Sequence, residues 1–190
     1  MPEYYVDLET TGLDAKKDMV VAIAYQRLGM LTGRGEGNLT ILKAWETSEK
    51  DVLERFLPVF MGGGPFSFVA IGLNIPFIYS FIVERSRIHG LEAPDPLYLM
   101  GSKPYLDLKP LLVMMNNGSF KGASLENFTD LSSSSDMVPK AFYENDHKAI
   151  LDHIMEKSSE FLRLYRHLKE VMPELSVKRP APDQRSVLTI

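Results

Sequence analysis

Two acidic residues stand two positions apart among apolar neighbours near the start of the chain. In "YYVDLETTGLD", Asp7 and Glu9 interrupt a run of aromatic and apolar residues that is typical of a β-strand. Side chains two positions apart in a strand point to the same face, so the pattern predicts two adjacent carboxylates on a surface that should be apolar. Such charges repel each other and are costly to bury, whereas a divalent cation between them removes both penalties. The stretch therefore predicts a metal site.

The elements that must position these carboxylates are predicted to form an α/β sheet. Runs of β-branched and apolar residues predict strands at 3–9, 19–28 and 39–45, which form an antiparallel meander, and further strands at 66–73 and 105–108. Helical patterns are expected at 49–60, 76–89, 109–117, 123–131 and 139–172. Because helices alternate with the later strands, we expect helices on both faces of the sheet.

The chain length suits one domain, which we place at residues 1–172. Residues 173–190 contain two prolines after Pro173 and no periodicity, and are expected to form a flexible C-terminal tail. No signal peptide is visible and no apolar run reaches the length of a membrane span. With the absence of cysteine, these features favour a cytoplasmic protein without a membrane partner.

The string "VDLETTGLD" resembles the first motif of the DEDD superfamily of 3′–5′ exonucleases, the DnaQ-like enzymes of the ribonuclease H-like fold. The predicted strand order is that of their mixed sheet, a three-strand antiparallel meander plus parallel strands, and the resemblance covers residues 3–170. It implies a divalent-metal-dependent hydrolase of phosphodiester bonds at the 3′ end of DNA or RNA. In such enzymes, the residues matching Asp7 and Glu9 bind metal ions that activate water and stabilise the leaving oxygen.

The composition is compatible with this implied chemistry. Without cysteine, the available ligands are oxygen and nitrogen atoms, and carboxylates suit hard cations such as Mg²⁺ or Mn²⁺. The formal net charge of −4 argues against a protein that coats duplex DNA, since such proteins are usually basic. A nuclease that holds a few nucleotides at a metal centre needs no such excess of positive charge. After the metal strand, backbone N–H groups of Thr10, Thr11 and Gly12 could meet a terminal nucleotide, although turn formation explains these residues equally well.

The second motif of the family, Asn-x-x-Phe-Asp at the start of a helix, corresponds to "NIPFI". Asn74 and Phe77 match it and are expected to contact nucleic acid, but Ile78 stands where a metal-binding aspartate is expected. Isoleucine cannot bind a cation. This departure supports a second hypothesis, a catalytically degenerate protein that binds nucleic acid or a protein partner on the same scaffold. A third hypothesis is an endonuclease of related fold that acts on structured DNA.

The third motif of the family falls in "AFYENDHKAILDHI" and matches in two ways. His147 and Asp152 fit His-x-Ala-x-x-Asp, whereas Asp146 fits Tyr-x-x-x-Asp-x-x-Ala with Phe142 at the tyrosine position. In one continuous helix, Asp146 falls on the apolar face and Asp152 on the opposite side. We therefore favour Asp146 as the third carboxylate and keep Asp152 as the alternative. His147 could act as a general base or be a partly exposed helix residue.

Two further positions have weaker signals. Asp107 in "YLDLKPLL" is expected to cap the following helix, although it could also approach the carboxylate edge of the sheet. Phe120 and Lys121 lie in a loop flanked by glycines, where they could contact a base and a phosphate.

Overall fold

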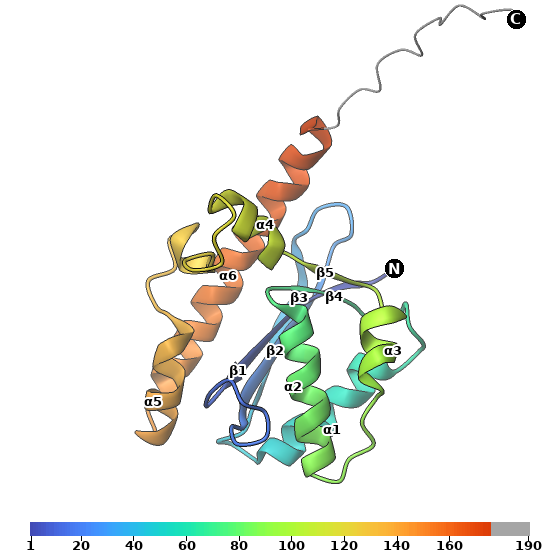
Figure 1. Ribbon diagram of the computed structural model, residues 1–190, viewed down its shortest axis with the longest axis vertical. Coiled ribbons are helices and arrows are strands. Elements are labelled where there is room, and N and C mark those ends of the chain that lie inside the picture. Colours follow the sequence, from blue (N-terminus) through green and yellow to red (C-terminus); the bar gives the residue numbers. More distant parts are fainter. Residues whose placement is uncertain (176–190) are drawn as a thin grey trace, which may run out of the picture.

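A five-stranded mixed sheet organises the protein, whose computed structural model describes residues 1–175. Its strands are β1 (Glu3–Thr10), β2 (Val20–Leu28), β3 (Gly35–Lys43), β4 (Val69–Gly72) and β5 (Tyr105–Asp107), in the order β3-β2-β1-β4-β5 (Figure 1). The pairs β1–β2 and β2–β3 are antiparallel, and β1–β4 and β4–β5 are parallel. The expected meander followed by parallel strands is confirmed.

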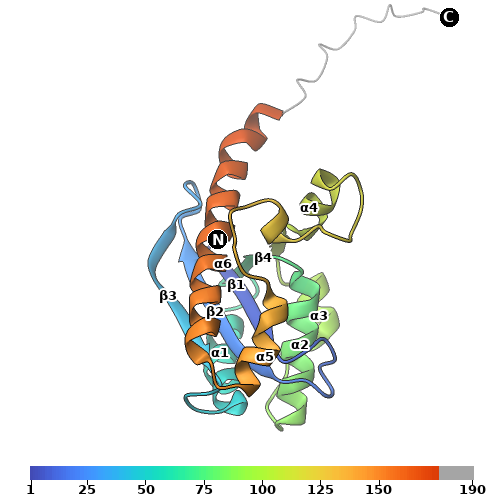
Figure 2. The same cartoon turned by 90° about the vertical axis from the view of Figure 1, so that its left-hand side faces the viewer.

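Helices cover both faces of this sheet, as expected. They are α1 (Glu49–Met61), α2 (Ile75–Ile88), α3 (Pro96–Gly101), α4 (Lys109–Met115), α5 (Val138–Tyr143) and α6 (His147–Val171). Helices α1 to α3 lie on one face, and α4 to α6 lie on the other (Figures 1 and 2). The core is divided accordingly, because Val6 of β1 packs with α1 and α2, whereas Tyr5 packs with α4 and α6.

The alternation of β1 aims the two acids at α6. Asp7 and Glu9 share the face of Tyr5 and pair across the sheet with Ala24 and Ala22 of β2. Both alanines are buried in the cluster that also contains the α6 residues Ile150 and Ile154. Their small side chains let the helix pack closely over the β1 carboxylates.

Strand β1 continues beyond the end of its parallel neighbour. Strand β4 pairs only with residues 3–5 of β1, so Asp7 and Glu9 lie past the last paired position. Gly72 ends β4 close to β1, where a Cβ atom would lie 2.6 Å from the carbonyl oxygen of Val6. In open α/β sheets, ligands bind in the crevice beyond the carboxyl ends of the strands. The fold therefore places both carboxylates in such a crevice.

The helix expected at 139–172 is instead two helices. Helix α5 ends at Tyr143, Asn145 adopts a left-handed conformation with φ 59°, and α6 begins after Asp146. Asn tolerates this conformation better than most residues, so it can end one helix and redirect the chain into the next. Because the two helices are separate, Asp146 does not lie on the apolar face of one continuous helix, where the sequence predicts it.

Other boundaries also differ from the expected ones. Residues 123–131 contain only a 3₁₀ turn at Leu125–Asn127, and β3 begins at Gly35. Helix α3 lies between the helix expected at 76–89 and the strand expected at 105–108. Asp95 accepts hydrogen bonds from the N–H groups of Leu97 and Tyr98, and Pro96 begins the helix.

No helix within residues 1–175 is long and apolar enough to cross a membrane. Of the expected tail, Met172–Leu175 forms a 3₁₀ turn, and residues 176–190 lie outside the described part of the chain. The division into a domain at 1–172 and a tail stays a prediction.

Candidate functional site

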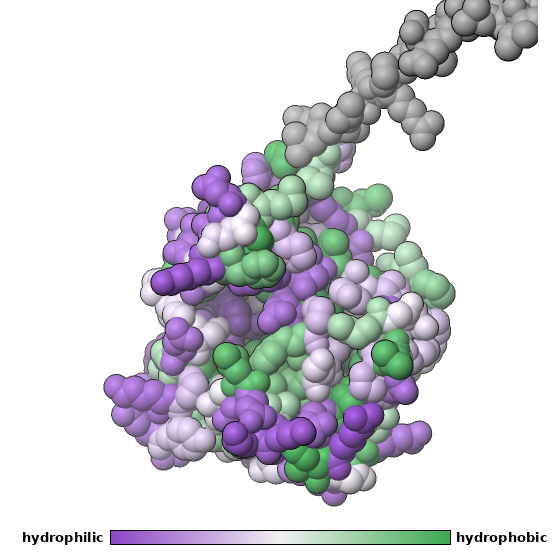
Figure 3. Space-filling view, viewed as in Figure 1, coloured by the Kyte–Doolittle hydropathy of each residue, from purple (hydrophilic) through white to green (hydrophobic). Residues whose placement is uncertain are grey.

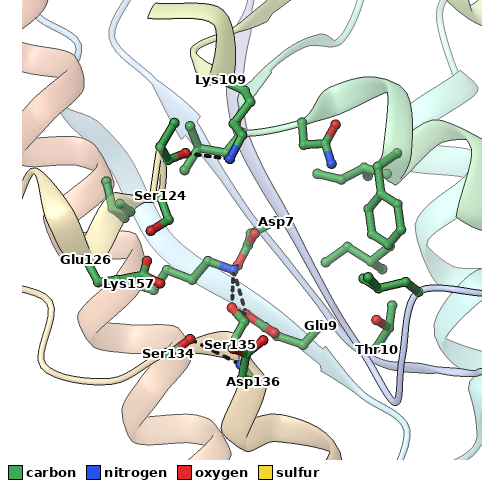
Figure 4. A pocket seen from close by; sticks show the side chains of 18 of the residues that line it. Asp7, Glu9, Thr10, Lys109, Ser124, Glu126, Ser134, Ser135, Asp136 and Lys157 are labelled. Carbon is green, nitrogen blue, oxygen red and sulfur yellow. Dashed lines mark hydrogen bonds and ion pairs between the residues drawn. The ribbon is translucent and has the colours of Figure 1, made fainter. Parts of the chain in front are cut away.

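A groove of about 560 Å³ opens where β1 passes the end of β4. Its walls come from β1, the start of α2, the segment between α4 and α5, and α6 (Figure 4). The hollow is visible on the molecular surface with both hydrophilic and hydrophobic residues around it (Figure 3). The charged residues lining it are Asp7, Glu9, Lys109, Glu126, Asp136 and Lys157.

Lys157 of α6 lies between the two carboxylates at the floor of this groove. Its Nζ is 2.8 Å from Oδ2 of Asp7 and 2.7 Å from Oε1 of Glu9 (Figure 4). The acids are buried, with relative exposures of 7% and 3%. Oδ2 of Asp7 has no hydrogen bond within residues 1–175, so its contact with Lys157 is an ion pair without hydrogen-bond geometry. One ammonium group thus contacts both acids and offsets part of their negative charge.

The three charges have different effects on one another. Burial raises the pKa of Asp7, and the ammonium of Lys157 offsets this effect only in part. Burial acts in the same direction on Glu9, but Lys157 and His153 together lower the pKa of Glu9 to about 2. Burial acts to lower the pKa of Lys157, and the two carboxylates reverse this and hold that pKa above its usual value. Glu9 and Lys157 therefore form a firm ion pair at neutral pH, with Asp7 beside them.

His153 is the second residue of α6 whose side-chain nitrogen contacts Glu9. The imidazole is buried, and its Nε2 lies 3.3 Å from Oε1 of Glu9. Ser133 Oγ lies 2.7 Å from Nδ1 of His153 and Ser135 Oγ lies 3.2 Å from Nε2, so the segment before α5 holds both edges of the ring. The histidine is fixed in place, and it helps to position the carboxylate of Glu9.

The third-motif candidates lie elsewhere. Asp146 is exposed at the start of α6, where its carboxylate accepts a hydrogen bond from the N–H of Ala149. Asp152 is exposed and forms an ion pair with Lys148 on the outer side of α6. His147 stacks on Trp45, with ring centroids 5.1 Å apart. The structure does not bring these three residues into the groove with Asp7 and Glu9.

The predicted nucleic-acid contacts lie closer to the groove. Thr10, Gly12, Asn74 and Phe77 all line it. Thr10 donates a hydrogen bond to the carbonyl oxygen of Gly12, so it also stabilises the turn. Thr11 does not line the groove; it is buried and accepts a hydrogen bond from the N–H of Met19.

The start of α2 has an unusual backbone. Asn74 caps this helix in the left-handed conformation with φ 56°, and its side chain makes no capping hydrogen bond. Its N–H instead donates to Oδ1 of Asp107, which also accepts from the N–H of Lys109. Asp107 thus joins the ends of two helices, close to its expected capping role, and does not line the groove. Ile78, at the departed second-motif position, is buried in the core at the groove wall.

These residues do not fit a divalent metal centre. The position between Asp7 and Glu9 is filled by the ammonium of Lys157, and Ile78 cannot act as a ligand. Within the described 1–175 range, no three His, Asp or Glu residues are grouped so that they could hold a metal ion. The only candidate metal ligands at this position within residues 1–175 are therefore the carboxylates of Asp7 and Glu9, and both already contact the ammonium of Lys157.

Sequence reasoning missed His153 and Lys157. Their signal is helical spacing, since both fall within the stripe of α6 that also contains Ile150, Ile154 and Phe161. A basic residue at a position that should be buried requires a partner, and the acids of β1 were the unpaired charges available.

The sheet order β3-β2-β1-β4-β5, with helices on both faces, is that of an α/β protein with the ribonuclease H-like fold. Its structural neighbours include E. coli Exonuclease I in complex with a dT13 oligonucleotide, at 14% identity and a TM-score of 0.61 over 92% of this chain. The zinc-bound form of the E. coli ExoI–ssDNA complex matches at 14% identity and a TM-score of 0.62 over 90% of this chain. The chain spans about two-fifths of the length of these proteins, 42% and 41% respectively. No protein-family model and no curated protein sequence matches.

Proposed function

We propose that this protein binds single-stranded nucleic acid in the groove beside β1 and, with its present residues, does not hydrolyse it. The observation that carries this proposal is the ammonium of Lys157 between Asp7 and Glu9, which fills the place a catalytic cation would need. Ile78 at the second-motif position supports the same conclusion. The fold supports the choice of ligand, because the neighbours with TM-scores of 0.61 and 0.62 are complexes with an oligonucleotide and with ssDNA.

The charge of the groove determines how a single strand of nucleic acid would bind. Four acids and two lysines line it, so phosphate groups gain little from the walls. Apolar side chains at its rim are unusually exposed, notably Leu13 at 83% and Phe120 at 73%. Bases stack on exposed aromatic rings in a manner that tolerates any sequence. Binding through bases favours a single strand, whose bases are accessible, and predicts a shallow dependence of affinity on salt.

A Mg²⁺- or Mn²⁺-dependent 3′–5′ exonuclease is the second candidate. It is favoured by the side-by-side carboxylates of Asp7 and Glu9. It is also favoured by the buried Oδ2 of Asp7, which has no hydrogen bond to any group in residues 1–175. In this candidate, Lys157 would have to leave both acids before a metal ion could bind. DNA and RNA are equally compatible with the groove.

One experiment separates the candidates. Labelled single-stranded DNA and RNA are incubated with the protein, with and without Mn²⁺, and both binding and product length are measured. Our proposal predicts a retained complex and intact strands under every condition. Products shortened stepwise from the 3′ end would support the second candidate, and internal cuts would indicate an endonuclease. Absence of binding to either nucleic acid would overturn the proposal.

A further inference from the structure

The acidic pair of β1 is buried in a way that requires a permanent counter-charge. Asp7 and Glu9 lie on the same face of one strand, and their relative exposures are below one tenth. Two buried carboxylates at this separation repel each other, and each has lost the hydration that would stabilise its charge. A chain that folds without a metal ion must therefore provide a cation from its own residues.

Lys157 is built into that position. Its side chain has a relative exposure of only 14%, and its Nζ lies within 2.8 Å of an oxygen of each acid. A third contact holds the side chain in place, because Nζ also donates a hydrogen bond of 3.1 Å to Ser135 Oγ. Lys148 of the same helix shows the contrast, since its side chain is 85% exposed and, among the ion pairs within residues 1–175, it pairs with its helical neighbour Asp152.

The position of Lys157 on α6 makes this contact a fixed feature of the packing. It lies between Ile154 and Phe161, which are both fully buried against the sheet. The helix cannot rotate to withdraw the lysine without exposing these residues. If the Lys157 side chain moved away, both buried carboxylates would lose their counter-charge, which is energetically costly.

We propose that the ammonium of Lys157 is a permanent substitute for a divalent cation, and that it masks a latent metal site formed by the carboxylates of Asp7 and Glu9. The inference deepens the proposed function, since it states why the groove would bind a strand without hydrolysing it. A site with two carboxylates is a minimal one, of the kind that Mg²⁺ and Mn²⁺ use together with water and phosphate oxygens. Removing Lys157 is thus expected to expose metal affinity that the native chain lacks.

Calorimetric titration of MnCl₂ into the full chain tests this inference without nucleic acid. Native protein is expected to show no binding heat at millimolar Mn²⁺. Lys157→Ala is expected to bind Mn²⁺ with an affinity at least roughly tenfold above that detection limit. Lys148→Ala is the matched control on the same helix and should behave as the native protein. Adding Glu9→Gln to Lys157→Ala removes one of the two ligands and should abolish the gained affinity.

Two outcomes would overturn the inference: Mn²⁺ binding at Asp7 and Glu9 in the native protein, or no gain in Lys157→Ala. Because that variant could fail to fold, paramagnetic broadening by Mn²⁺ is also measured on the native protein by NMR. Selective broadening around Asp7 and Glu9 at submillimolar Mn²⁺ would contradict the inference, and its absence with intact spectra would support it. If the native protein does not bind single-stranded nucleic acid but the metal results are as expected, the proposed function is rejected and the inference about Lys157 stands.

Discussion

His153 and Lys157, one helical turn apart on α6, both contact the same oxygen atom of Glu9. Nε2 of His153 lies 3.3 Å and Nζ of Lys157 lies 2.7 Å from Oε1, while only Lys157 reaches Asp7. The two acids are therefore unequal: Glu9 is strongly stabilised as an anion, and Asp7 is compensated only in part. This asymmetry separates the expected effects of substitutions at the site.

Replacing Lys157 with methionine should strongly destabilise the fold. The substitution keeps the apolar part of the side chain but leaves two buried carboxylates without a counter-charge. Breaking a buried ion pair from one side typically costs about 3–5 kcal/mol in the free energy of unfolding. Urea unfolding at pH 7 measures the change. Lys148→Met on the exposed side of α6 should change stability by less than about 0.5 kcal/mol.

A triple variant without the three charges isolates the electrostatic part of the stability lost in Lys157→Met. Asp7→Asn, Glu9→Gln and Lys157→Met together remove all three charges at nearly constant volume. Because buried ion pairs can often be replaced by neutral groups at little cost, the triple variant should recover most of the stability lost in Lys157→Met. If it is no more stable than Lys157→Met, lost packing rather than uncompensated charge explains the single substitution.

The response to acid should identify Glu9. Its pKa falls from an ordinary value of 4.5 to about 2 in the folded protein. A lowered pKa contributes stability that is present above pH 4.5 and is lost as the pH falls toward 2, in total on the order of 3 kcal/mol. Glu9→Gln should therefore be less stable than the native protein at pH 7, and the difference should shrink between pH 4.5 and pH 2. A difference that does not vary over this window would contradict the lowered pKa.

How far the sequence predicts this site is shown by its individual residues. The alternation of β1 correctly places Asp7 and Glu9 on one face, because strand periodicity is a local property. The position expected for Asp146 requires one helical face that continues through Asn145, but the left-handed conformation of Asn145 ends α5 without a proline or glycine to signal it. Lys157 was missed because its partner Glu9 is 148 residues away, and pairings of this kind appear only after the chain is folded.

Base stacking in the groove can be tested at Phe120. Its ring is 73% exposed at the groove rim, so Phe120→Ala should leave stability nearly unchanged. Loss of one stacked base should weaken binding of a single-stranded oligonucleotide by about 1–3 kcal/mol, roughly 5- to 150-fold, measured by fluorescence anisotropy. Phe66→Ala is the matched control, since Phe66 is 57% exposed and does not line the groove. Equal affinities of the two variants would exclude stacking on Phe120.

Ile78 tests the second-motif position. Ile78→Asp in the native background should destabilise the fold, because the new carboxylate joins a site that already contains two. In the Lys157→Ala background, the same substitution should increase Mn²⁺ affinity beyond that of Lys157→Ala alone, as measured by calorimetry. Ile78→Asn supplies the control of similar size without the charge. Unchanged metal affinity in the double variant would mean that position 78 does not face the acidic pair.

Whether Lys157 takes the place of a metal ion can be seen in a crystal structure of the native protein grown with MnCl₂, with anomalous diffraction recorded. We expect Nζ of Lys157 between the carboxylates of Asp7 and Glu9 and no anomalous peak at that position. A manganese peak coordinated by both carboxylates, with Lys157 turned away, would contradict this expectation.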